Sequence, residues 1–167
     1  MTTRLIATDL DGTIVRSDGE ISARTREALA AAEDAGLLVV FVTGRPPEVM
    51  KPISDATGHR GVAVCANGAV LYDLHTEEIV EHFPMDVEVA RALTTAIREA
   101  LPDIAFAVQS GRSMAHEPAF RANFELPPDV VVAELDHLLR EPVVKLLASH
   151  HTLTAAEMLA RSRDLVG

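Results

Sequence analysis

The 167-residue chain is poor in several features that define other protein classes. It has no tryptophan and a single cysteine, Cys65, and aromatic residues make up only 4% of it. One cysteine excludes a disulfide within the chain and favours a reducing compartment. The scarcity of aromatic side chains argues against recognition by base stacking. With 48% hydrophobic residues, the core must be built from Ala, Val, Leu and Ile, as in many α/β proteins.

Positive charge is also in short supply. The chain has 15 Lys and Arg against 25 Asp and Glu, which gives a formal net charge of -10. This balance argues against a broad nucleic-acid footprint and against adhesion to anionic membranes. No apolar run reaches the roughly 18 residues that a membrane span needs, and the start Met1–Arg4 lacks the apolar region of a signal peptide. We therefore expect a soluble cytoplasmic protein with neither nucleic acid nor membrane as a partner.

Strand and helix patterns alternate in the first half of the chain. The apolar run Leu5–Ala7 is followed by a helical pattern that Ser22 can cap and Gly36 can end. Leu37–Val42 is then an unbroken apolar run of strand length. A strand, a helix and a buried strand in this order predict an α/β fold with a Rossmann-like parallel sheet. The further elements expected are a helix over 46–58, a strand over 61–65, a turn at Asn67-Gly68 and a strand over 69–72.

From about Phe83 the pattern changes and a second module begins. Its expected helices cover 89–101 and 154–165, with a helical turn over 136–140 and short strands over 104–108, 113–115, 130–133 and 142–148. Thr152 or Thr154 can cap the last helix. We predict two domains, 1–82 and 83–167.

The segment Asp9-Leu10-Asp11-Gly12-Thr13 stands at the carboxyl end of the first predicted strand. Side chains alternate along a strand, so the two carboxylates point the same way. Gly12 permits a sharp turn after them, and Thr13 adds a hydroxyl. In parallel sheets, ligands bind at this edge. Taken alone, however, Asp-x-Asp-Gly is also compatible with an ordinary turn or a fragment of a calcium loop.

These residue types suit phosphoryl transfer. Asp9 is placed to be a nucleophile that forms an aspartyl-phosphate, and Asp11 to protonate the leaving oxygen and deprotonate water. The two carboxylates would hold Mg²⁺, a cation that prefers hard oxygen ligands and offsets the charge of a phosphate.

The second predicted strand ends in Thr43-Gly44-Arg45. The Thr43 hydroxyl and backbone N–H groups near Gly12 and Gly44 can donate to phosphoryl oxygens. The Arg45 guanidinium suits an anionic substrate group, although it can equally serve as a surface ion pair. Asn67 is first a turn residue, with a second interpretation at the mouth of the site.

Asp9–Thr13 and Thr43–Arg45 resemble the first two motifs of the haloacid dehalogenase superfamily of phosphatases. The resemblance implies that Asp9 is the nucleophile and Asp11 the general acid/base. The motifs are 34 positions apart (43 minus 9), which leaves room for one helix and no cap domain between them. The module that follows Cys65–Ala69 instead resembles the C2 cap of the Cof-type branch. That branch implies sugar phosphates and related small phosphomonoesters as substrates, and the spacing disfavours a phosphomutase.

The family's third motif, a lysine, and its fourth, an acidic loop that completes the Mg²⁺ site, are not recognisable here. Lys145 is the candidate for the third, but only 22 residues follow it (167 minus 145). In register with the family, the last residues resemble the middle of a cap, so we expect a C-terminally truncated chain that lacks the later core strands.

Two functional hypotheses remain from the sequence. One is a Mg²⁺-dependent phosphatase acting on small phosphorylated metabolites, and the other is a non-catalytic fragment that serves as a binding or interaction module. An incomplete sheet would expose an edge and apolar surface, which predicts self-association.

Overall fold

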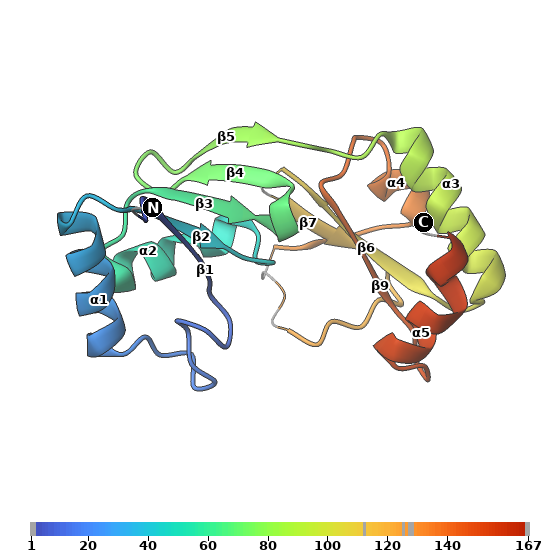
Figure 1. The fold of residues 1–167 in the computed structure, drawn as a ribbon. Coiled ribbons are helices and arrows are strands. Elements are labelled where there is room, and N and C mark those ends of the chain that lie inside the picture. The colour runs from blue at the N-terminus through green and yellow to red at the C-terminus, as the bar shows by residue number, and fades with distance from the viewer. Residues whose placement is uncertain (1–2, 112, 125, 127–128, 166–167) are drawn as a thin grey trace. The chain divides into compact units, whose positions relative to one another are not determined.

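The computed structural model describes residues 3–111, 113–124, 126 and 129–165. The chain divides into two compact units, Met1–Phe83 and Pro84–Gly167, each with its own sheet (Figure 1). Both units combine strands and helices, so the predicted α/β class is confirmed. None of the helices in the described ranges has the length and apolarity needed to cross a lipid bilayer.

The first unit is built on a sheet with the strand order β1-β2-β3-β4-β5. Its strands are β1 (Leu5–Asp9), β2 (Leu38–Val42), β3 (Val62–Cys65), β4 (Val70–Asp73) and β5 (Glu78–His82). The first three strands are parallel, and β4 and β5 continue the sheet as antiparallel neighbours. Neighbouring parallel strands need crossover connections. Helical segments form the connection from β1 to β2 and the connection from β2 to β3. Strand β5 was not predicted, because its exposed edge position leaves only a weak apolar alternation.

Helix α1 (Ala23–Asp34) begins as predicted, since the Ser22 side chain accepts a hydrogen bond from Thr25 N at 3.1 Å. The predicted helix over 46–58 is divided into a 3₁₀ turn, η1 (Pro47–Val49), and the α-helix α2 (Lys51–Thr57). Pro52 explains the division, because its ring would clash with a carbonyl one turn earlier in a continuous helix.

Both helices lie on one side of this sheet (Figure 1). The β2 side chains Val39 and Phe41 point to that side and are buried. On the other side, Leu5, Leu38 and Val42 remain 50%, 53% and 37% exposed. Leu5 pairs with Leu38 in the parallel register, so their side chains share one face. We call these three residues the open apolar face.

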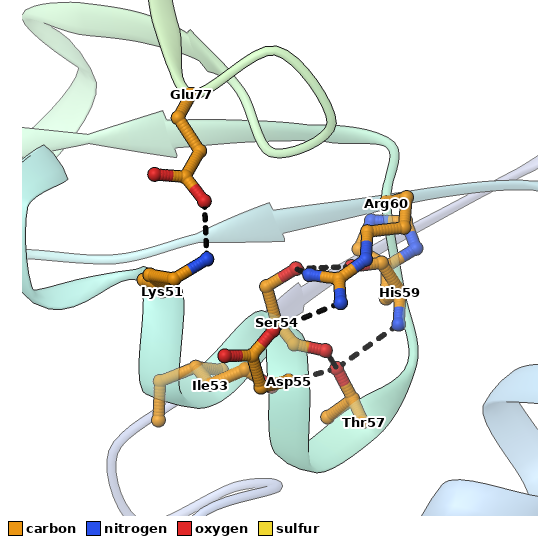
Figure 2. A network of polar contacts seen from close by, with 8 residues as sticks. All are labelled: Lys51, Ile53, Ser54, Asp55, Thr57, His59, Arg60 and Glu77. Atoms are coloured by element: carbon orange, nitrogen blue, oxygen red, sulfur yellow. Dashed lines mark hydrogen bonds and ion pairs between the residues drawn. The ribbon is translucent and has the colours of Figure 1, made fainter.

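Polar side chains fix the exit from α2 (Figure 2). Thr57 Oγ1 donates to Ile53 O at 2.8 Å and accepts from His59 N at 3.3 Å. Ser54 Oγ donates to His59 O at 2.6 Å and accepts from Arg60 Nη1 at 2.6 Å. These contacts satisfy helix-end groups and direct the chain into β3.

His59 is the buried centre of this exit. Its Nδ1 lies 2.6 Å from Glu33 Oε1 of α1, and its ring centroid lies 4.5 Å from that of Phe41. A Cβ added at Gly61 would come within 2.6 Å of His59 Cε1. Only glycine therefore fits at position 61 while the imidazole keeps its place.

The second unit has the strand order β8-β7-β6-β9. Its elements are α3 (Val87–Ala100), β6 (Ala105–Ser110), β7 (Ser113–His116), β8 (Val131–Val132), α4 (Leu135–Leu138), β9 (Lys145–Ser149), α5 (Ala155–Ser162) and the 3₁₀ turn η3 (Arg163–Leu165). Ile97 of α3 packs with Phe106 of β6, whereas Phe120 packs against Ala107 on the opposite face of that strand. Of the two candidate caps for α5, Thr154 is the one used, in a capping box with Glu157.

The Gly61 contact generates a stability test. We expect Gly61→Ala to lower the free energy of unfolding by about 1–3 kcal/mol, since the new methyl group overpacks a buried ring. The same substitution made on a His59→Ala background should cost clearly less, because the obstructing ring is gone. Urea unfolding of the four proteins in this cycle measures both values. An equal cost in both backgrounds would contradict the assignment of the strain to His59.

Candidate active site

The site is organised by two neighbouring strand ends. In the parallel register Asp9, the last residue of β1, pairs with Val42, the last residue of β2. The residues that follow, Leu10 and Thr43, therefore leave the sheet side by side. Asp9 and Asp11 are both exposed, and Leu10 between them is fully buried. This pattern agrees with the predicted alternation of the two carboxylates.

A tight turn follows Asp11. Gly12 has a φ of +77°, a conformation that glycine adopts without strain. Its N–H donates to Val15 O at 2.9 Å, and Thr13 N donates to Leu10 O at 3.2 Å. Both N–H groups are thus used within the turn. The predicted phosphate-binding role of backbone N–H groups near Gly12 and Gly44 stays a prediction, while the observed contribution of Gly12 is the shape of the turn.

Thr43 is the buried polar residue at the end of β2, with 3% exposure. Its Oγ1 accepts a hydrogen bond from Arg45 N at 3.1 Å, and its carbonyl accepts one from Asn67 N at 3.1 Å. Arg45 O accepts a further bond from Ala66 N at 2.9 Å. Because Thr43 Oγ1 acts as an acceptor towards Arg45, its O–H hydrogen is left to donate elsewhere. The backbone bonds also bring the turn containing Asn67 beside the end of β2.

Arg45 clamps Asp11 with the flat edge of its guanidinium group. Arg45 Nε lies 2.9 Å from Asp11 Oδ2 and 3.2 Å from Oδ1, and Nη2 lies 2.6 Å from Oδ1. The hydrogen bonds from Arg45 lower the pKa of Asp11 below its ordinary value of 3.8, against the opposing effect of partial burial. The same pair raises the pKa of Arg45. Asp11 is therefore a carboxylate at neutral pH.

This clamp was not predicted. The sequence placed Asp11 and Arg45 at neighbouring strand ends and left Arg45 with two roles, as a substrate contact or as a surface ion pair. The structure shows the ion pair, made with a proposed catalytic residue. The two positions are 34 residues apart, so no local pattern could identify the contact.

The donor chemistry of the strand ends is compatible with Mg²⁺. Proteins often hold this cation by one or two carboxylates together with waters and substrate phosphate, and Asp9 and Asp11 provide two hard oxygen ligands. Within the described ranges, no group of three or more His, Cys, Asp or Glu side chains is arranged to hold a metal.

Lys145 and Cys65 belong to other strands. Lys145, the candidate for a phosphate-steadying lysine, begins β9 of the second unit, where burial lowers its pKa. Cys65 is buried at the end of β3, and burial raises the pKa of its thiol to about 12. Such a thiol is unreactive at neutral pH.

Comparison with known proteins gives a consistent family. Residues 6–164 match the model of the haloacid dehalogenase-like hydrolases. The chain is 39% identical over 99 residues to the pyridoxal phosphate phosphatase YbhA of Escherichia coli, a match that covers 59% of this chain and 36% of that protein. It is 37% identical over 90 residues to the 5-amino-6-(5-phospho-D-ribitylamino)uracil phosphatase YwtE of Bacillus subtilis, covering 54% of this chain and 30% of the relative. The matches thus span about a third of these relatives.

Solved structures share the fold. A haloacid dehalogenase-like hydrolase from B. subtilis matches with a TM-score of 0.60 and 28% identity, covering 68% of this chain and 39% of the other. The subclass IIB sugar phosphatase BT4131 matches with a TM-score of 0.70 and 18% identity, covering 95% of this chain and 63% of the other. At 18% identity, the second likeness concerns the fold alone.

The Asp11–Arg45 clamp predicts a measurable titration. Because the folded-state pKa of Asp11 is depressed, the ionised carboxylate stabilises the fold above pH 3.8, and this contribution is lost as the pH falls through the folded pKa. Arg45→Gln should raise the pKa of Asp11 towards its ordinary value, as followed by carboxyl-carbon NMR. Arg16→Gln, which removes the exposed Arg16–Asp18 pair, is the matched control. An unchanged Asp11 titration in Arg45→Gln would show that the clamp does not form in solution.

Proposed function

Because the chain belongs to the haloacid dehalogenase-like hydrolase family, we propose that its first unit carries the catalytic strand ends of a Mg²⁺-dependent phosphatase. The substrates are small phosphorylated metabolites, with sugar-phosphate-like monoesters as the narrower class. Residues 1–82 belong to the catalytic core and residues 83–167 to a cap domain in this proposal. The observation that carries it is the grouping of Asp9, Asp11, Thr43 and Arg45 at two adjacent strand ends.

Similar proteins support the substrate class. The two curated relatives are described as phosphatases of pyridoxal phosphate and of a phosphoribitylamino uracil. Both named substrates are small molecules that carry a phosphate group. A net charge of -10 means that attraction of such an anion depends on local groups, for which Arg45 and a bound cation are the candidates.

The proposed reaction has two steps. In the first, an Asp9 carboxylate oxygen attacks phosphorus and the bond from phosphorus to the leaving oxygen breaks. Asp11, which must take up a proton from solvent once it is no longer held by Arg45, gives that proton to the leaving oxygen. In the second, Asp11 takes a proton from water, the water oxygen attacks phosphorus, and the bond between phosphorus and Asp9 breaks to release inorganic phosphate. Mg²⁺ held by Asp9 and Asp11 would offset the negative charge of the phosphoryl group.

The neighbouring residues have orienting roles in this proposal. The Thr43 hydroxyl donates to a phosphoryl oxygen, which its free hydrogen allows. Gly12 and Thr13 form the turn that presents Asp11, while Gly44 and Asn67 shape the rim beside Thr43. Arg45 contacts the anionic part of the substrate.

A second candidate is a non-catalytic binding module. The observation in its favour is that the described residues lack a full acidic metal cluster. In this case the strand ends would bind phosphate or a cation weakly without turnover.

Substitution of the nucleophile separates these functions. We expect the chain to hydrolyse an aryl phosphate at millimolar Mg²⁺ and Asp9→Asn to abolish this activity, since an amide cannot form the covalent intermediate. Asp34→Asn is the matched control, because Asp34 ends α1 just before β2 begins at Leu38, and so precedes the starts of the strands rather than following their ends. Unchanged activity in Asp9→Asn would exclude the mechanism, whereas no activity in the parent chain would favour the binding module.

We also propose that the chain is cytoplasmic and self-associates through the first unit. Strand β1 stands at one end of its sheet order, so one of its edges pairs with β2 and the other faces no strand among the described residues. Leu5, Leu38 and Val42 of the open apolar face lie on and beside this edge strand. An exposed edge next to apolar side chains favours pairing with another chain.

Sedimentation velocity tests the self-association. We expect the 167-residue chain to form dimers or larger species, and Leu38→Glu to shift them towards monomer because it places a charge on the open apolar face. Leu159→Glu is the control, since Leu159 is similarly exposed, at 50%, but lies on α5 of the second unit. A monodisperse monomer for the parent chain would contradict the proposal.

A further inference from the structure

The geometry points to an exchange of partners at the candidate site: Arg45 holds Asp11 when no anion is bound and transfers its guanidinium donors to the phosphoryl group of an incoming substrate. Arg45 is then a substrate-binding residue that the substrate displaces from Asp11. This inference rests on the proposed function, because it concerns the same site and the same anionic substrate.

The two partners compete for one edge of the guanidinium group. The clamp uses Nε and Nη2 together, at 2.9 Å from Oδ2 and 2.6 Å from Oδ1 of Asp11. Carboxylates and phosphates are both recognised by parallel N–H donors on such an edge. Arg45 cannot present this edge fully to Asp11 and to a phosphoryl group at the same time.

The exchange requires movement of the side chain alone. The Arg45 backbone is fixed on both sides, because its N donates to Thr43 Oγ1 at 3.1 Å and its O accepts from Ala66 N at 2.9 Å. The side chains of Arg45 and Asp11 are 32% and 55% exposed. Water therefore already competes for the pair, and exposed ion pairs of this kind contribute little to stability.

Charge favours the exchange once a phosphate arrives. Asp9 and Asp11 are acidic groups that repel an incoming anion, and Arg45 neutralises Asp11 while the site is empty. A phosphate monoester can carry more negative charge than one carboxylate and offers more acceptor oxygens. Transfer of the guanidinium donors to the phosphate then leaves the oxygens of Asp11 free of the clamp, which its proposed role as proton carrier requires.

Binding of inorganic phosphate without Mg²⁺ tests the exchange without catalysis. Dissociation constants are measured by calorimetry for the parent chain, Asp11→Asn, Arg45→Gln and the double variant. If Arg45 is held by Asp11, Asp11→Asn should tighten phosphate binding about tenfold more when Arg45 is present than on the Arg45→Gln background. If Asp11 acts only through its charge, Asp11→Asn will change the phosphate dissociation constant by the same factor whether residue 45 is Arg or Gln. That result would overturn the inference.

Asp9→Asn supplies the matched control for loss of a nearby negative charge. No contact between Asp9 and Arg45 is found among the described residues, so this substitution should change phosphate affinity by the same factor with and without Arg45. Failure of Asp11→Asn to bind phosphate at all would also overturn the inference, because a released guanidinium would then attract no anion.

The outcomes separate this inference from the proposed function. In one outcome, the chain hydrolyses aryl phosphate while Asp11→Asn changes phosphate affinity by the same factor with and without Arg45. That result would support the proposed function and contradict the exchange of Arg45 between Asp11 and phosphate. A chain that lacks turnover but shows the tenfold coupling retains the exchange as a property of an anion-binding site. The circular dichroism of each variant confirms that the fold is intact.

Discussion

The parallel pairing of β1 with β2 is the constraint on which the candidate site depends. The register that joins Asp9 to Val42 makes both strands end at the same level. Residues 34 positions apart in sequence, Asp11 and Arg45, can then meet within hydrogen-bonding distance. Buried Leu10 and Thr43 fix the chain on each side of this meeting point. The pairing of the two strands thus sets the positions of the candidate site residues, and the loops that follow β1 and β2 carry their side chains.

The same pairing leaves the first unit with two contrasting sides. Val39 and Phe41 are buried on the side of the helices, whereas Leu5 and Leu38 on the other side stay half exposed. Asp9 stands at the end of β1, in register with Val42 of the open apolar face. Apolar surface of this kind is stabilised by a covering partner, so the proposed association and the proposed chemistry involve adjoining parts of one sheet.

Much of this organisation could be predicted from short-range patterns. The Ser22 cap, the existence of the strand before Thr43 and the carboxylates around Leu10 each follow from a few neighbouring residues. The expectation that this strand is buried holds on one face only, since Leu38 and Val42 are exposed. Other features depend on distant partners, such as the guanidinium clamp on Asp11. Within the turn, the Gly12 N–H is taken by Val15 O, a bond that composition does not reveal. Pro52 did carry a signal for the divided helix, because proline disfavours a continuous helix at its position.

The central claim is that Asp9 is the residue that accepts the phosphoryl group. The most direct measurement is rapid acid quenching of the chain during turnover of an aryl phosphate with Mg²⁺, followed by peptide mass spectrometry. We expect the mass of one phosphoryl group on the peptide that contains Asp9, localised to that carboxylate. Phosphate release without any labelled Asp9, or a label on another residue, would contradict it.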